Sequence, residues 1–142
     1  MKNKIIYSLL SIFLSFSLMS TSCKKKDECE AGTGGNLTVV AYLKHHGRII
    51  ANQPGHPDTV WLKFNTQNAP GSGVSNYDKF FVGEEGEDHV HLSGLKCGDY
   101  YFYAAGLDTT LDTIQNPHVV GGIPFSTDKT SGEVEFDIPV SE

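Results

Sequence analysis

Basic residues are scarce in this sequence, which has 11 Lys and Arg against 17 Asp and Glu and a formal net charge of −6. A protein that binds nucleic acid neutralises phosphates with clustered Lys and Arg. The one basic cluster here is the run Lys24 to Lys26. The charge balance therefore argues against nucleic acid as a partner.

Catalytic signatures are missing as well. The sequence has no Gly-x-Ser-x-Gly, no His-Glu-x-x-His and no phosphate-binding loop. Glu84 and Glu85 are paired carboxylates, but they share one loop, whereas a glycosidase needs its two carboxylates across a cleft. We therefore expect a protein that is not an enzyme and has no catalytic residues.

The one long apolar run lies at the N-terminus. Lys2 and Lys4 precede Ile5–Met19, which is short for a transmembrane helix and is followed by small residues and then Cys23. This order is typical of a secretory signal peptide, which we place at residues 1–22. The remaining 120 residues carry a net negative charge and are enough for one domain with one core.

A cysteine at the cleavage point resembles the lipobox of bacterial lipoproteins, in which that thiol is acylated, although Ser20 stands where leucine is usual. The charged run after Cys23 resembles the export tag of surface lipoproteins of the Bacteroidota. The resemblance implies a lipidated tether over residues 23–35, anchored in the outer membrane and exposed at the cell surface. An ordinary cleaved signal with an incidental Cys23 is the alternative.

The other two cysteines, Cys29 and Cys97, remain as a pair if Cys23 carries lipid. Disulfides form and persist in the oxidising cell envelope. We therefore expect a Cys29–Cys97 bridge, with two free thiols as the alternative.

No helical period of useful length appears after residue 22. Alternating apolar and polar residues predict about seven short strands, as in a single antiparallel β-sandwich of the all-β class. The expected strands are Leu37–Lys44, Arg48–Ile50, Thr59–Asn65, Tyr77–Val82, two strands within His89–Asp108, and Gly132–Val140. Around Gly121 and Gly122 a strand is expected to be weak or bulged, and Pro139 marks the last strand as an edge.

The run Val90-x-Leu92-x-Gly-Leu95-x-x-Gly98-x-Tyr100 resembles a turn of carboxypeptidase regulatory-like domains and collagen-adhesin B-type repeats, which share a prealbumin-like sandwich. The resemblance implies such a domain over residues 36–142, with Leu95 plugging the core and Gly98 making the turn. Cys97 stands where proline is usual, which suggests that a disulfide holds the turn. Many members of these families are spacers or accessory modules, so the resemblance names no ligand.

Two histidines form the first candidate site. His89 and His91 are spaced i and i+2, so they share the outer face of a strand. Such imidazoles can chelate Zn²⁺ or Cu²⁺, and nearby acids could add oxygen ligands: Glu84, Glu85, Glu87 and Asp88. The other histidines fall in expected turns or loops and could converge there: His45, His46, His56 and His118. A solvated acidic hairpin with surface histidines is the alternative.

Outward aromatic residues form the second candidate site. The expected register places Trp61, Tyr101 and Tyr103 on the outer face of their strands. Exposed aromatic rings in a row can stack on sugar rings. Cross-strand aromatic pairing explains the same pattern without a ligand, and a register shifted by one residue would put these rings in the core.

The sequence as a whole predicts a lipid-anchored binding or accessory module of the cell envelope, without catalysis and without an identified ligand. One alternative is a Zn- or Cu-binding lipoprotein that uses its surface histidines. The other is a spacer or carbohydrate-contacting module whose partner is an envelope protein or a glycan.

Overall fold

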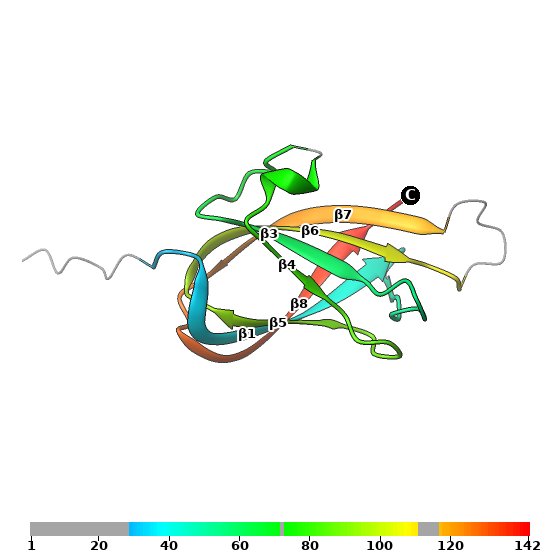
Figure 1. Ribbon diagram of the computed structural model, residues 1–142, viewed down its shortest axis with the longest axis horizontal. Coiled ribbons are helices and arrows are strands. Elements are labelled where there is room, and N and C mark those ends of the chain that lie inside the picture. Colours follow the sequence, from blue (N-terminus) through cyan, green and yellow to red (C-terminus); the bar gives the residue numbers. More distant parts are fainter. Residues whose placement is uncertain (1–28, 72, 111–116) are drawn as a thin grey trace, which may run out of the picture.

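The computed structural model describes residues 29–71, 73–110 and 117–142, so the expected signal peptide and Cys23 lie outside the described residues. The described residues form two four-stranded sheets, one over the other (Figure 1), which confirms the all-β, sandwich-like expectation. The described part includes one short 3₁₀ turn, η1 (Val74–Asn76), and holds no helix long and apolar enough to cross a membrane. The strands are β1 (Thr33–His45), β2 (Arg48–Ile49), β3 (Thr59–Phe64), β4 (Lys79–Val82), β5 (Val90–Leu95), β6 (Gly98–Leu107), β7 (His118–Thr127) and β8 (Ser131–Val140).

The first sheet is organised around β1. Strands β5 and β2 pair antiparallel with β1, whereas β8 runs parallel to it, from the pair Asn36–Ser131 to the pair His45–Val140. The expectation of a wholly antiparallel sandwich is therefore wrong for this pair. A parallel pair needs a long connection, and six strands separate β1 from β8 in the chain.

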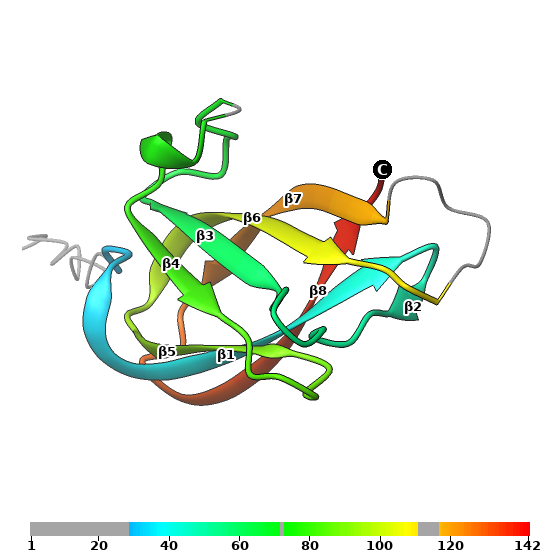
Figure 2. The same cartoon turned by 45° about the vertical axis from the view of Figure 1, so that its right-hand side comes forward.

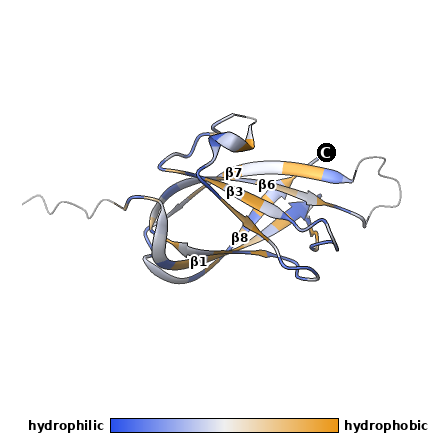
Figure 3. Cartoon of the chain, viewed as in Figure 1, coloured by the Kyte–Doolittle hydropathy of each residue, from blue (hydrophilic) through white to orange (hydrophobic). Residues whose placement is uncertain are grey.

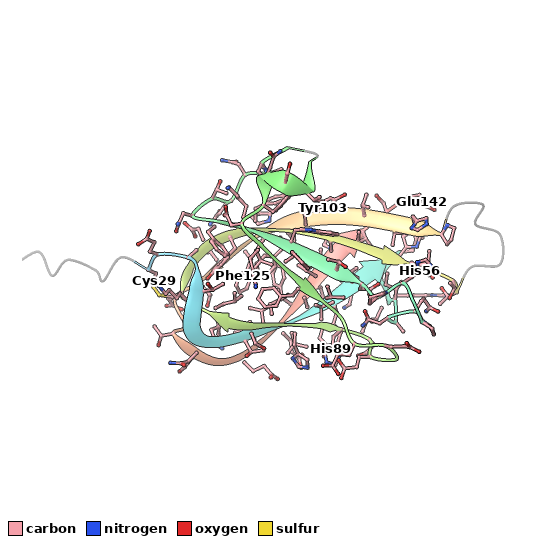
Figure 4. All side chains as sticks on the ribbon, viewed as in Figure 1. Cys29, His56, His89, Tyr103, Phe125 and Glu142 are labelled. Carbon is pink, nitrogen blue, oxygen red and sulfur yellow. A yellow bond between two sulfur atoms is a disulfide. The ribbon has the colours of Figure 1, made fainter. Side chains whose placement is uncertain are left out.

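The second sheet has the order β4-β3-β6-β7 and is antiparallel throughout (Figure 2). Its inner face supplies Leu62, Phe102 and Phe125 to the core. Phe125 lies between the two sheets (Figure 4), and its ring centroid is 4.8 Å from that of Phe136 on β8. Hydrophobic segments of both sheets are visible in Figure 3, while the connecting loops are mostly hydrophilic. The predicted alternation of inner and outer residues is confirmed.

Strand β7 is continuous, so the expected weakness at its two glycines is wrong. It pairs with β6 residue by residue from His118 to Thr127. A Cβ on Gly121 would lie 2.0 Å from the carbonyl oxygen of Pro139, and one on Gly122 would lie 2.7 Å from the Tyr101 hydroxyl. These glycines allow β8 and the ring of Tyr101 to approach the backbone of β7 closely, and they do not interrupt its pairing.

Ordered structure begins before the expected boundary at residue 36. Strand β1 starts at Thr33, and the side chain of Ala31 belongs to the core. The chain passes so close to the β5–β6 turn that a Cβ on Gly98, whose φ is +138°, would lie 2.4 Å from the Ala31 nitrogen. The hydroxyl of Tyr100 accepts a hydrogen bond from the Gly32 N–H at 3.1 Å. The predicted tether therefore does not extend to residue 35, because this segment packs on the turn.

The disulfide between Cys29 and Cys97 is present, as expected. It joins the start of the described chain to the turn between β5 and β6, at the end of the molecule where Figure 4 labels Cys29.

Candidate metal centre

The first candidate site lies where the chain enters β5. Val90 and Leu92 are fully buried, so the period of two turns His89 and His91 to the outer face, as predicted. Figure 4 shows His89 directed away from the space between the sheets. The Nε2 atoms of the two rings are 3.0 Å apart, which is a hydrogen bond between the imidazoles, and the ring planes are nearly perpendicular at 87°.

This separation matches two ligands of one ion. Imidazole nitrogens bound to a tetrahedral Zn²⁺ at the usual bond length lie about 3.3 Å apart. At the right angles of a square-planar Cu²⁺ they lie about 2.9 Å apart. The distance between His89 Nε2 and His91 Nε2 falls between these values, so the pair suits either metal.

One acidic residue completes the group. Glu87 Oε2 lies 3.6 Å from His89 Nε2, and ligand atoms of Glu87, His89 and His91 all lie within 4.8 Å of one another. This group of three contains none of the other acids expected as ligands, which are Glu84, Glu85 and Asp88. The structure therefore places one of the predicted carboxylates, that of Glu87, beside the predicted pair of histidines.

Asp88 acts on the other nitrogen of His89. Its Oδ1 lies 2.8 Å from His89 Nδ1. A carboxylate accepts a hydrogen bond from Nδ1–H, which leaves Nε2 of the neutral ring with its lone pair directed at the group. Asp88 therefore orients a ligand rather than serving as one.

Asn52 fixes the backbone of the site and was not expected from the sequence. Its side chain is buried, and Nδ2 donates hydrogen bonds of 3.0 Å to the carbonyl oxygens of both Glu87 and His89. Its Oδ1 accepts from the Asp58 N–H at 2.7 Å. A Cβ on Gly83 would overlap this side chain, so glycine makes room for the clamp. No local pattern links Asn52 to residues 35 and 37 positions away.

An acidic surface adjoins the histidines. Val40 of β1 pairs with His91 on one side and with Glu135 of β8 on the other. Glu133, Glu135 and Asp137 all face outward on β8. Burial, followed by the carboxylates of Glu135, Asp88, Glu133 and Asp137, raises the pKa of the Tyr42 hydroxyl above its ordinary value. Lys44 Nζ pairs with Asp137 Oδ2 at 2.6 Å, and the carboxylates that remain make the field over this face attractive to cations.

The outer aromatic residues lie in the predicted register. Trp61 pairs with Tyr103, and their ring centroids are 5.7 Å apart. Tyr77, which the sequence did not indicate, stacks on Tyr103 at 5.6 Å. Trp61, Tyr101 and Tyr103 are half-buried, so the alternative register is wrong. Because the rings contact one another across strands, packing accounts for the cluster, and its role as a ligand contact stays a prediction.

Histidines elsewhere do not join His89 and His91. Among the described residues, His45 and His46 gather with Glu142, and His56 and His118 line a separate hollow beside β3 and β6. The possibility that these four histidines converge with His89 and His91 is therefore wrong, because they lie on different parts of the sandwich.

Comparison with models of known protein families, with curated proteins and with solved structures gave no match.

Proposed function

We propose that this chain is a non-catalytic module of the cell envelope that binds one transition-metal ion, Zn²⁺ or Cu²⁺, through Glu87, His89 and His91. The observation that carries the proposal is the 3.0 Å separation of the two Nε2 atoms, with Glu87 Oε2 at 3.6 Å from one of them. Two imidazoles and one carboxylate are a common ligand set for these ions.

The surroundings support this reading. Asp88 holds the His89 tautomer that a metal requires, and Asn52 holds the backbone of two ligands. Carboxylates on β8 add negative potential over the same face. With three protein ligands at the surface, a coordination position is left for a ligand from outside, which suits capture or delivery of an ion.

The placement in the envelope rests on the sequence. The signal peptide over residues 1–22 directs export and is removed, and the lipid on Cys23 anchors the module in the outer membrane, exposed at the cell surface. The prealbumin-like topology belongs to the same proposal, supported by the Gly-Leu turn before Tyr100. Intact-mass measurement of the membrane-extracted chain tests the anchor, since lipidation adds acyl chains to a chain that starts at Cys23.

Metal binding can be tested by calorimetric titration of the full chain, purified in detergent without a histidine tag. We expect the number of metal ions bound per chain to fall by one when His89 and His91 are both changed to alanine. His91→Ala alone is expected to weaken binding at this site by about tenfold or more, because one of two nitrogen ligands is gone. Cu²⁺ is expected to bind more tightly than Zn²⁺.

His56→Ala is the matched control, because His56 is exposed and lies outside the group. The His56→Ala variant should bind as many metal ions per chain as the wild type. If the His89→Ala/His91→Ala variant binds as many ions as the wild type with equal affinity, the proposal is wrong.

A further inference from the structure

A second group of ligand atoms lies at the far end of β1, and it does not depend on the function proposed above. One ligand atom from each of His45, His46 and Glu142 lies within 4.8 Å of the other two. His45 Nε2 is 3.4 Å from Glu142 Oε2, and His46 Nε2 is 4.0 Å from Glu142 Oε1. The His45 side chain is only 1% exposed, whereas His46 and Glu142 reach the surface. His45 ends β1, His46 lies in the turn that follows, and Glu142 follows β8.

Asp108 orients the imidazole of His45 through a hydrogen bond to Nδ1. Its Oδ2 lies 2.7 Å from His45 Nδ1, and both side chains are buried. Asp108 is itself held by Thr110, whose hydroxyl donates to Oδ1 at 2.7 Å and whose backbone N–H donates at 2.9 Å. A histidine that gives its Nδ1–H to a fixed carboxylate presents a bare Nε2, which is the arrangement found behind metal ligands.

The Nε2 atom of His45 is directed at a carboxylate but makes no hydrogen bond. It lies 3.4 Å from Glu142 Oε2 and has no hydrogen-bond partner, although it is buried. A bare nitrogen and a carboxylate oxygen facing each other repel, unless a positive charge lies between them. Their separation is close to the distance of about 3.3 Å between two ligand atoms on one tetrahedral zinc ion.

Two carboxylates lie beside the ring of His45: Asp108 Oδ2 is 2.7 Å from Nδ1, and Glu142 Oε2 is 3.4 Å from Nε2. Arg48 also lines the adjoining pocket and carries the opposite sign, but the two carboxylates outnumber it. The pocket has a volume of about 260 Å³ and is lined by His45, His46, Arg48, Asp108 and Thr110, so an ion can reach the group.

The hairpin between β1 and β2 brings the two histidines together. Consecutive strand residues point to opposite faces, so His45 and His46 would diverge in a regular strand. His46 instead has φ of +48° and Gly47 has φ of +77°. The ring centroids of His45 and His46 are 4.2 Å apart. Asn, Asp or Gly is usual at the first of these turn positions, so His46 occupies a position that favours other residues.

A change of strand partner brings Glu142 to the histidines. Val140 pairs with His45 in the first sheet, but Ser141 exchanges two backbone hydrogen bonds with Val120 of the second sheet, at 2.8 and 2.9 Å. The residue after Ser141 is thereby held at the junction of the sheets, opposite the ring of His45 (Figure 4 labels Glu142).

From this geometry we infer that His45, His46 and Glu142 form a second site for a divalent transition-metal ion, with Asp108 as the residue that positions His45. Zn²⁺ fits the two imidazoles and one carboxylate, and the open side toward the pocket leaves a coordination position for a further ligand.

The test uses the full chain with His89→Ala and His91→Ala, so that the first site is silent. We expect this parent to bind one Zn²⁺ per chain in a calorimetric titration. His46→Ala and Glu142→Gln should each weaken the binding by about tenfold or more. Both residues are exposed, so neither change is expected to disturb folding, and circular dichroism checks this.

His56→Ala and Glu30→Gln are the matched controls and should leave the affinity unchanged. Zinc should also raise the midpoint of thermal unfolding of the parent by more than that of the Glu142→Gln variant, because an ion bound to the native state stabilises it in proportion to its affinity. A parent that binds no zinc, or variants that bind it as tightly as the parent, would overturn the inference. Because the first site is absent throughout, failure here leaves the proposed function untouched.

Discussion

Replacing Cys29 and Cys97 together by serine is expected to lower the free energy of unfolding by about 4 kcal/mol. The two cysteines are 68 positions apart and their disulfide closes more than half of the described chain into a loop. A crosslink over so long a loop restricts the unfolded chain strongly. The bridge also holds the segment that packs Ala31 against Gly98, so its loss frees that contact as well.

Urea denaturation followed by fluorescence of the single tryptophan, Trp61, measures this effect. Wild-type protein in a reductant should match the double serine variant, since both lack the bridge. Changing the third cysteine, Cys23→Ser, should leave stability unaltered. A double variant within about 1 kcal/mol of the wild type would contradict the role given to the disulfide.

Asp58→Asn is expected to stabilise the protein at pH 8 by about 2 kcal/mol and to flatten the dependence of stability on pH. Asp58 is 1% exposed, and neither carboxylate oxygen has a hydrogen-bond partner. Burial raises the pKa of this carboxyl from 3.8 to about 7. A contact with the backbone N–H of Leu107, which falls short of a full hydrogen bond, offsets part of the rise.

The direction of the pH effect follows from the raised pKa. Between pH 4 and pH 7 the folded protein keeps the proton of Asp58 while the unfolded chain releases it, so stability falls as pH rises through this window. Above pH 7 the loss is complete, because both states are then charged. The full difference in pKa corresponds to roughly 4 kcal/mol, of which relaxation around the charged carboxylate is expected to return about half.

Stability curves from pH 4 to pH 9 for the wild type and Asp58→Asn test this prediction. Asp128→Asn, a change at an exposed aspartate, is the control and should follow the wild type. An Asp58→Asn variant that is less stable than the wild type at pH 8 would show that the charged carboxylate has a stabilising partner.

The inner and outer faces of the strands could be predicted because alternation is local. Leu62 and Phe102 are fully buried, and Trp61 and Tyr103 face outward, as a period of two requires. Alternation gives no information on which strands become neighbours or in which direction they run. The parallel pairing of β8 with β1 therefore appears only in the structure.

Contacts between distant segments account for the other errors. Gly121 and Gly122 interrupt the apolar pattern, but they make room for Pro139 and Tyr101. The glycine-rich segment before β1 resembles a flexible linker in composition, but Ala31 is buried against the turn at Gly98. In each case the reason for the residue lies in a partner far along the chain.

The candidate site divides in the same way. His89 and His91 are two positions apart on one strand, so their common face could be predicted. The clamp by Asn52 and the group formed by His45, Asp108 and Glu142 join residues that are 35 to more than 60 positions apart. Composition and spacing carry no signal for such groups.

Nitrogen-15 NMR of the histidine side chains during a Zn²⁺ titration of the full chain tests the central claim most directly, because it resolves each imidazole. We expect the Nε2 signals of His89 and His91 to shift together and to saturate at the same zinc concentration. The signal of His56 should stay in place throughout. If the signals of His89 and His91 do not move, or move without saturating while His56 moves with them, the metal site proposed at β5 does not exist.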